Sequence, residues 1–267
     1  MSAAIALQTY LAVLGRKAIF PIAYLGHVAL FLIQGVAHIF SYPFQFKKIL
    51  EQINIIGAKS LFVIALTGAF TGMVMGLQGY YTLVMFGSEE MLGSGVALSI
   101  IRELGPVLTA IMIIGRAGSA MAAEIGIMRI SEQIDALETM DINPIRFLVS
   151  PRIAACLFSF PLLTAIFDAI GIFGGYLTGS VLLGINPGSF FHWMEASVEM
   201  QDINGGFLKS VVFALVVAVI CCYQGFHTHQ QKGGFGAKGV SQSTTRAVVS
   251  SCVLILITDY VLTSFLL

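Results

Sequence analysis

The sequence predicts an all-α integral membrane protein with five transmembrane helices, an N-terminal interfacial helix and a short helix on the cytoplasmic side. Hydrophobic residues make up 57% of the 267 residues and charged residues only 10%, whereas soluble domains carry roughly 25% charged residues. Five apolar runs reach the length of about 20 residues that a spanning helix needs. Lys and Arg gather between alternate runs, which is the pattern of a multi-pass membrane protein.

The five runs cover residues 55–81, 91–115, 152–180, 206–227 and 245–266. On one side of the membrane lie the N-terminal segment and the loops 116–151 and 228–244, which hold the basic residues between the runs. The opposite loops, near 82–90 and 181–205, contain carboxylates but no Lys or Arg. Because basic loops stay in the cytoplasm, we expect a cytoplasmic N-terminus and a C-terminus on the opposite side.

A sixth apolar segment, residues 18–40, has basic residues at both ends: Arg16 and Lys17 before it, Lys47 and Lys48 after it. Crossing the bilayer would leave one basic pair outside, so an interfacial or re-entrant helix is favoured. A sixth span is the alternative, because the segment is long enough. We treat residues 1–267 as one domain, with an N-terminal segment over about 1–50.

The first run contains Gly68, Gly72 and Gly76, four residues apart. Small residues at this spacing share one helix face and let another helix approach closely, so they predict a packing surface. Gln78, Tyr80 and Tyr81 follow near the outer membrane boundary. Aromatic side chains are ordinary there, and a role in substrate binding is the alternative interpretation.

The second run carries Arg102 and Glu103 near its middle, followed by Pro106. Charges at that depth normally face a protein interior or a water-filled cavity. Adjacent residues point about 100° apart around a helix, so each charge needs its own partner. Pro106 cannot donate to the carbonyl of Arg102, which predicts a kink and a free carbonyl beside the charges. Both a structural ion pair and a substrate or gate site fit this pattern.

The loop after the second run carries a short amphipathic pattern, in which Ile127, Ile130, Ile134, Leu137 and Met140 recur at helical spacing. The other faces are acidic, with Glu124, Glu132, Asp135, Glu138 and Asp141 against a single Arg129. Interfacial helices are usually rich in Lys and Arg on the polar face. Docking of a cytoplasmic protein is therefore favoured over passive contact with the bilayer.

Other motifs exclude several kinds of chemistry. The sequence contains no GxxxxGK[ST] motif, so this chain has no P-loop for a nucleotide. The four cysteines lie in apolar runs without ligand spacing, and His227 and His229 flank a helix end, so no metal site is expected. Asp168 and Asp259 lie inside the third and fifth runs. Such carboxylates are functional candidates, or are protonated or hydrogen-bonded to a neighbouring helix.

A set of motifs in order along the chain resembles the MlaE-type permease family, the membrane subunits of bacterial ABC transporters that work with MCE-domain proteins on phospholipids. The motifs are GLQGY (76–80), RELGPV (102–107), GRAGSAMAAEIGIM (115–128), SEQI (131–134), SPR (150–152), PLLTAIF (161–167), KSVVFA (209–214) and TTRAVV (244–249). The resemblance runs from about residue 50 to the end. Before residue 50 only the character of the segment is similar, and there the family has an interfacial elbow helix.

The resemblance implies a homodimer in the bacterial inner membrane, with a lipid cavity that opens toward the periplasm. Carried over by position, the candidate substrate-binding residues are Arg102, Glu103, Gln78, Tyr80 and Tyr81. Segment 125–141 would be the coupling helix on which an ATPase docks, through Glu124, Arg129, Glu132, Asp135 and Glu138. A hexameric ring of MCE-domain subunits and a small STAS-domain subunit are further implied partners.

By this resemblance the chain moves phospholipids between the inner membrane and a periplasmic MCE channel and maintains outer-membrane lipid asymmetry. It is expected to perform no chemistry and to hold no cofactor, with ATP and Mg bound on the partner ATPase. The alternative is an ion-coupled secondary transporter that uses Arg102, Glu103, Asp168 and Asp259 as a proton relay. No clustered His, Ser or Cys supports an intramembrane enzyme.

Overall fold

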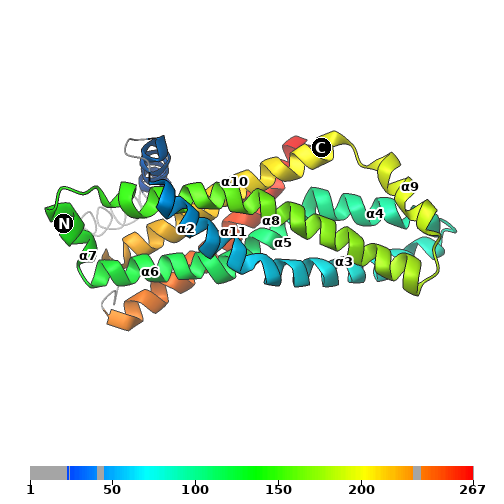
Figure 1. Cartoon of the computed structure of the whole chain (residues 1–267), viewed down its shortest axis with the longest axis horizontal. Helices are drawn as coiled ribbons and strands as arrows, with labels where there is room; N and C mark the ends of the chain where they lie inside the picture. Colours follow the sequence, from blue (N-terminus) through cyan, green and yellow to red (C-terminus); the bar gives the residue numbers. More distant parts are fainter. Residues whose placement is uncertain (1–22, 24, 41–44, 231–235, 267) are drawn as a thin grey trace, which may run out of the picture.

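The structure, a computed structural model, describes residues 23, 25–40, 45–230 and 236–266, and every regular element in these ranges is a helix. Five helical stretches are long and apolar enough to cross a membrane, and they run along the long axis of the molecule (Figure 1). They are Phe46–Val84, Glu89–Ile130, Ile145–Leu182, Met200–Phe226 and Gly236–Leu266. The predicted fold class is confirmed.

The spanning stretches are α-helices joined by short 3₁₀ and π turns. The α-helices are α2 (Phe46–Ile56), α3 (Leu61–Val84), α4 (Leu92–Ser99), α5 (Gly105–Ile113), α6 (Ser119–Ile130), α7 (Gln133–Thr139), α8 (Ser150–Tyr176), α9 (Pro187–Ser197), α10 (Met200–Phe226) and α11 (Gly236–Leu266). The π turns are η4 (Ile100–Leu104), η5 (Ile114–Gly118), η6 (Ile145–Val149) and η7 (Leu177–Leu182). The second span therefore consists of α4, α5 and α6 with a π turn at each junction.

The helices extend well beyond the apolar runs of the sequence. The second span covers 42 residues, about 60 Å of helix at 1.5 Å per residue, against a hydrocarbon core of about 30 Å. The prediction that this helix ends near residue 115 was wrong, because it continues to Ile130. Hydropathy marks the part of a helix that lies in lipid, and the polar continuation keeps helical hydrogen bonding without an apolar signal.

The glycine face of α3 packs against α8, as the spacing predicts. Gly68, Gly72 and Gly76 are buried, and a Cβ atom on Gly72 would collide with the backbone carbonyl of Gly171. A Cβ atom on Gly76 would lie 3.0 Å from the carbonyl oxygen of Gly175. The two backbones therefore meet without intervening side chains, which gives close packing where lipid supplies no hydrophobic driving force.

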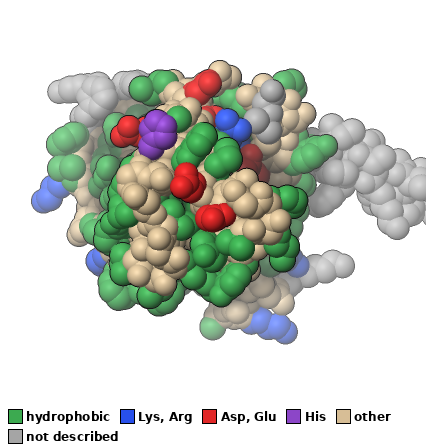
Figure 2. Space-filling model, turned by 90° about the vertical axis from the view of Figure 1, so that its right-hand side faces the viewer, with side chains coloured by type: hydrophobic (Ala, Val, Ile, Leu, Met, Phe, Trp, Pro, Cys, Tyr) green, Lys and Arg blue, Asp and Glu red, His purple; other side chains and the backbone are tan. Residues whose placement is uncertain are grey.

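The two ends of the bundle hold different elements (Figure 1). One end holds the turn between α3 and α4 together with α9, and Figure 2 shows carboxylates there among hydrophobic side chains. The other end holds α7, the end of α10 and the start of α11 (Figure 1). The C-terminal turn of α11 returns beside the start of α10, because a Cβ atom on Gly205 would lie 3.7 Å from a methyl carbon of Leu266.

The N-terminal segment contains a 13-residue helix, Leu25–Ala37, that lies across the bundle axis (Figure 1). The described residues of this helix cover about 20 Å. Phe31 is 5% exposed and packs edge-on against Tyr223 near the end of α10, with ring centroids 5.5 Å apart. The described part of the segment thus fits the interfacial interpretation, and the basic pair before it lies outside the described residues.

The segment predicted as one amphipathic helix, 125–141, is two helical pieces. Helix α6 ends at Ile130 and α7 covers only Gln133–Thr139. Glu132 separates them with a left-handed φ of 57°, and Asp141 ends the second piece with a φ of 59°. Ile134 is fully buried, so this residue of the predicted apolar face still packs inward after the break. The prediction of a continuous helix was wrong, since a left-handed glutamate is uncommon and leaves no signal in the sequence.

Candidate functional site

Arg102 and Glu103 lie on the π turn η4 and, as predicted, have separate partners. The Arg102 Nε atom donates to Asp202 Oδ1 on α10 at 2.6 Å. Glu103 Oε2 accepts from Lys209 Nζ on α10 at 2.7 Å. Where the sequence predicted a kink before Pro106, the structure has this π turn, and the missing amide hydrogen of proline interrupts the α-helical ladder at the same place.

Lys209 connects three spans at this point, and the sequence analysis missed it. Its side chain is 3% exposed and lies 2.7 Å from Glu103 and 3.1 Å from Asp259 of α11. Its ammonium also donates to Thr263 Oγ1 at 2.7 Å. The carbonyl of Arg102, predicted to be free because of Pro106, accepts from Lys209 Nζ at 2.9 Å. A single lysine in an apolar run was the available signal, because such a charge must have partners in the membrane.

Asp202 is positioned by the start of α10. Its Oδ2 atom accepts from the Glu199 amide at 3.0 Å, and the Glu199 side chain accepts in return from the backbone of residue 202. This capping box satisfies two amide groups at the helix start and leaves Oδ1 directed at Arg102. A local signal at the end of a loop therefore fixes the acidic partner of a charge one hundred residues away.

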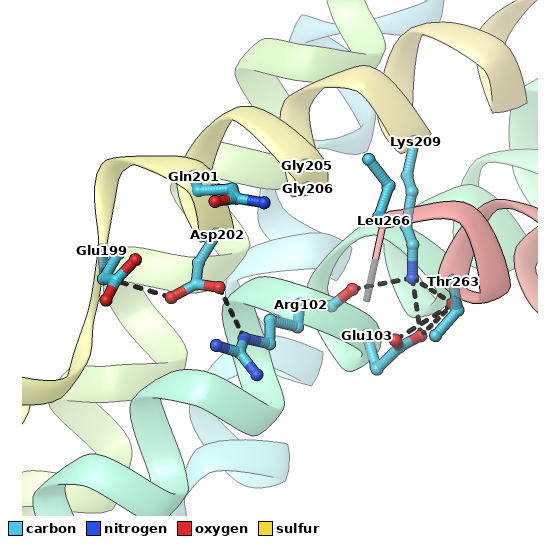
Figure 3. Close-up of a pocket in the computed structure, with 10 residues that line it drawn as sticks. All are labelled: Arg102, Glu103, Glu199, Gln201, Asp202, Gly205, Gly206, Lys209, Thr263 and Leu266. Carbon is cyan, nitrogen blue, oxygen red and sulfur yellow. Dashed lines mark hydrogen bonds and ion pairs between the residues drawn. The ribbon is translucent and has the colours of Figure 1, made fainter.

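These groups line a cavity of about 200 Å³ between the second, fourth and fifth spans (Figure 3). Figure 3 shows Arg102 and Asp202 on one side of it and Lys209, Glu103 and Thr263 on the other. Arg102 and Glu103 are each 39% exposed, although both are paired. Gly205 and Gly206 form part of the wall, so α10 presents backbone there. The cavity is lined by charged and polar side chains together with apolar surface, and it is partly open.

Gln78, Tyr80 and Tyr81 do not line this cavity. Gln78 and Tyr81 are exposed and Tyr80 is half-buried near the end of α3. Tyr80 and Tyr81 pack edge to face, with ring centroids 5.8 Å apart. Within the described residues of one chain, the predicted substrate-binding set therefore divides into the charged pair on η4 and a polar aromatic group on α3.

Asp168 and Asp259 have different environments. Asp259 joins the cluster through Lys209, whereas Asp168 lies on α8 against Gly105 of α5. The Asp168 Oδ1 atom is buried and has no hydrogen-bond partner among the described residues. Asp168 does not line the cavity, so the four groups of the alternative proton relay do not share one site.

The candidate docking residues lie at the end of the molecule that holds α7. Glu124 pairs with Arg152 at 2.9 Å, and Arg129 pairs with Asp135 at 2.7 Å. Glu132 and Glu138 are exposed. Glu138 lines an open hollow of about 420 Å³ between α7 and the start of the third span, with Asp141 and Pro144. Three of the five candidates, Glu124, Arg129 and Asp135, thus form ion pairs that stabilise this region. The other two, Glu132 and Glu138, face outward.

His227 and His229 stabilise the same end. Arg129 Nε lies 3.0 Å from His229 Nδ1, and the His227 ring packs on Tyr223 with centroids 4.1 Å apart. Burial lowers the pKa of both histidines below the usual value, and the positive charge of Arg129 acts in the same direction. A neutral His229 can accept the Arg129 hydrogen bond. Among the described residues no group of His, Cys, Asp or Glu could hold a metal ion.

Comparison with known proteins gives the family. The family model described as Permease MlaE matches residues 49–265. The chain is 44% identical over 222 residues, 83% of each chain, to the intermembrane phospholipid transport system permease protein MlaE of Haemophilus influenzae. It is 39% identical to a probable ABC transporter permease protein of Rickettsia bellii, over 94% of this chain and 95% of the relative.

A third relative is also a probable ABC transporter permease protein. The chain is 40% identical to a probable ABC transporter permease protein of Synechocystis, over 84% of both chains. The family model's match, residues 49–265, covers nearly all of the five spans. It includes the charged cluster around Lys209 and the α7 region. The chain is a multi-pass membrane protein and belongs to the MlaE permease family of ABC transporter permeases.

Proposed function

We propose that this chain moves phospholipids as the permease subunit of an ABC transporter in a bacterial inner membrane. The observation that carries the proposal is the polar cavity around Arg102 and Glu103, which lies in the bundle and has both charges partly exposed. Charged groups at that depth mark substrate pathways. A phospholipid headgroup combines charge with hydrogen-bonding oxygens, and its acyl chains would remain against the apolar helices.

Energy is supplied in this proposal by a separate ATPase that holds ATP and Mg and docks at α7. The outward-facing Glu132 and Glu138 and the open hollow beside Glu138 support this surface. The ion pairs Glu124 with Arg152 and Arg129 with Asp135 tie the surface to the spans. Movement at α7 would therefore reach the second and third spans through these pairs.

The assembly we propose is a homodimer with a hexameric ring of MCE-domain subunits on the periplasmic side and, in addition, a STAS-domain subunit. Large apolar side chains on α11, such as Tyr260 at 77% and Phe265 at 85% exposed, support burial against lipid or a second copy. The basic cytoplasmic loops support a cytoplasmic N-terminus and a periplasmic C-terminus. Transfer between the inner membrane and the MCE channel would maintain outer-membrane lipid asymmetry.

Co-purification distinguishes this proposal from an ion-coupled carrier. An affinity-tagged chain expressed with its native neighbours is expected to bring down an ATPase whose activity rises with added phospholipid. A carrier that transports alone and responds to a pH gradient, without any ATPase, would contradict the proposal.

A further inference from the structure

The charges around the cavity are not balanced. Its lining contains the cations Arg102 and Lys209 and the carboxylates of Glu103, Glu199 and Asp202. A fourth carboxylate, Asp259, lies 3.1 Å from Lys209. The lining thus holds two cations and three carboxylates, and Asp259 lies behind Lys209 without lining the cavity, so the site favours a ligand that carries positive charge.

The two cations are not equally available to a ligand. An ammonium group has three hydrogens to donate, and Lys209 already contacts the Arg102 carbonyl, Glu103 and Thr263 within 2.9 Å. Its side chain is 3% exposed. Arg102 is 39% exposed, and its hydrogen bond to Asp202 uses only Nε. A guanidinium has five N–H groups, which leaves the terminal nitrogens of Arg102 as the donors that can meet a phosphate.

A phosphate on the terminal nitrogens of Arg102 shares the guanidinium with Asp202, which accepts from Nε. The Asp202 side chain is only 9% exposed, and Arg102 is the cation that pairs with its Oδ1 atom. Two anions that share one guanidinium repel each other, which is a penalty for an anionic ligand. The exposed Glu199, beside it in the capping box, adds a second carboxylate at the same place. A ligand that brings its own cation next to the phosphate removes this penalty.

We propose that the cavity selects phospholipids with an ammonium group beside the phosphate, such as phosphatidylethanolamine, over anionic lipids such as phosphatidylglycerol. Arg102 takes the phosphate through its terminal nitrogens, while Asp202 and Glu199 take the ammonium, so that the ligand's own cation offsets the repulsion between its phosphate and these carboxylates. The inference rests on the proposed function. A cavity of about 200 Å³ is smaller than the roughly 300–1,000 Å³ typical of sites for whole drug-sized ligands, which fits a headgroup with its acyl chains outside.

The test uses the whole transporter complex, extracted in mild detergent from vesicles of equal amounts of dioleoyl phosphatidylethanolamine and dioleoyl phosphatidylglycerol. Mass spectrometry then gives the ratio of the two lipids retained by the complex. We expect about a tenfold excess of phosphatidylethanolamine over the vesicle ratio, the factor that one additional interaction of about 1.4 kcal/mol gives.

Two variants assign the preference to named residues. Asp202→Asn and Glu199→Gln each remove one negative charge from the headgroup site, and each is expected to lower the ratio toward one. Glu195→Gln is the matched control, because Glu195 is an exposed residue of α9 that does not line the cavity. It is expected to retain the wild-type ratio. The Glu199 variant keeps the test decisive if Asp202→Asn weakens assembly.

Equal retention of the two lipids, or an excess of phosphatidylglycerol, would overturn the headgroup inference and leave the phospholipid permease proposal standing. An unchanged ratio in both cavity variants would overturn it as well. If the assembled wild-type complex retains no phospholipid of either kind, the proposed function itself fails.

Discussion

At the scale of single residues, Lys209 determines how charges are tolerated inside this bundle. It is 3% exposed and holds the carboxylates of Glu103 and Asp259 from two other spans. In an isolated apolar run a lysine would be costly, but two carboxylates and a freed carbonyl satisfy it here. The same contacts fix the π turn that presents Arg102 to the cavity.

Replacement of Lys209 by Met should leave Glu103 and Asp259 without a cation. We expect a loss of about 3 kcal/mol in unfolding free energy, at the low end for a broken buried pair because Glu103 is 39% exposed. A lower thermal unfolding midpoint of the purified chain in detergent reports this loss of stability. The triple variant Lys209→Met, Glu103→Gln, Asp259→Asn should recover most of the stability. Equal stability of Lys209→Met and wild type would contradict the role of this cluster.

Gly72 determines how closely α3 and α8 approach, because its contact with the backbone of Gly171 leaves no room for a side chain. Gly72→Ala should destabilise the chain by about 1–3 kcal/mol, the usual cost of overpacking. Gly95→Ala is the control, since a Cβ atom at this helical position meets nothing within 4 Å. If thermal unfolding shows the same midpoint for both variants, then α3 and α8 are not packed as closely as described.

At the scale of elements, α7 is stabilised by side-chain contacts, because it is too short to be stable as an isolated helix. It has seven residues, too few for an isolated helix in water. Arg129 of α6 forms an ion pair with Asp135 of α7 and a hydrogen bond with His229. Residues with left-handed backbone, Glu132 and Asp141, lie on either side of α7. A short element of this kind moves as one unit with the spans to which it is tied.

Charge reversal at the outward-facing positions tests docking. The double variant Glu132→Lys, Glu138→Lys should reduce recovery of the ATPase with the tagged chain at least tenfold, while the chain folds normally. Neither residue takes part in an ion pair among the described residues. Glu90→Lys, an exposed change at the opposite end, should leave recovery unchanged. Full recovery of the ATPase with the double variant would refute docking through these carboxylates.

Acid should loosen the attachment of α7. The folded pKa of His229 lies below its usual value because of burial first and Arg129 second, although Asp135 opposes the shift. The unfolded state therefore binds the proton more readily, so stability is complete above about pH 6.5 and falls as the pH drops below it. His227 shifts in the same direction and also faces His27 and Arg129.

Hydrogen exchange measures this effect. After correction for intrinsic rates, amides of α7 should exchange faster at about pH 5.5 than at about pH 7.5, on either side of the ordinary histidine pKa. In His229→Gln, whose amide oxygen can still accept from Arg129, the extra exchange at low pH should be smaller. The same pH dependence in the variant would show that His229 is not the responsible group.

At the scale of the whole molecule, hydropathy and charge asymmetry predicted the number of spans, and the four-residue spacing of glycines predicted the contact face of α3. They did not predict where the helices end, because the second span continues through polar residues to Ile130. Arg102 and Glu103 were found from their depth in an apolar run. Their partners were not, because Asp202 and Lys209 are about one hundred residues away and only folding brings them together.

The central claim is that this bundle moves phospholipid when a partner hydrolyses ATP. The direct measurement places the complete transporter in vesicles containing fluorescent phospholipid and follows lipid exchanged with its soluble or MCE-domain acceptor. We predict transfer that requires ATP and falls at least tenfold in Arg102→Ala with the complex intact. Transfer that proceeds equally without ATP and follows a pH gradient, or no difference between Arg102→Ala and wild type, would contradict the account.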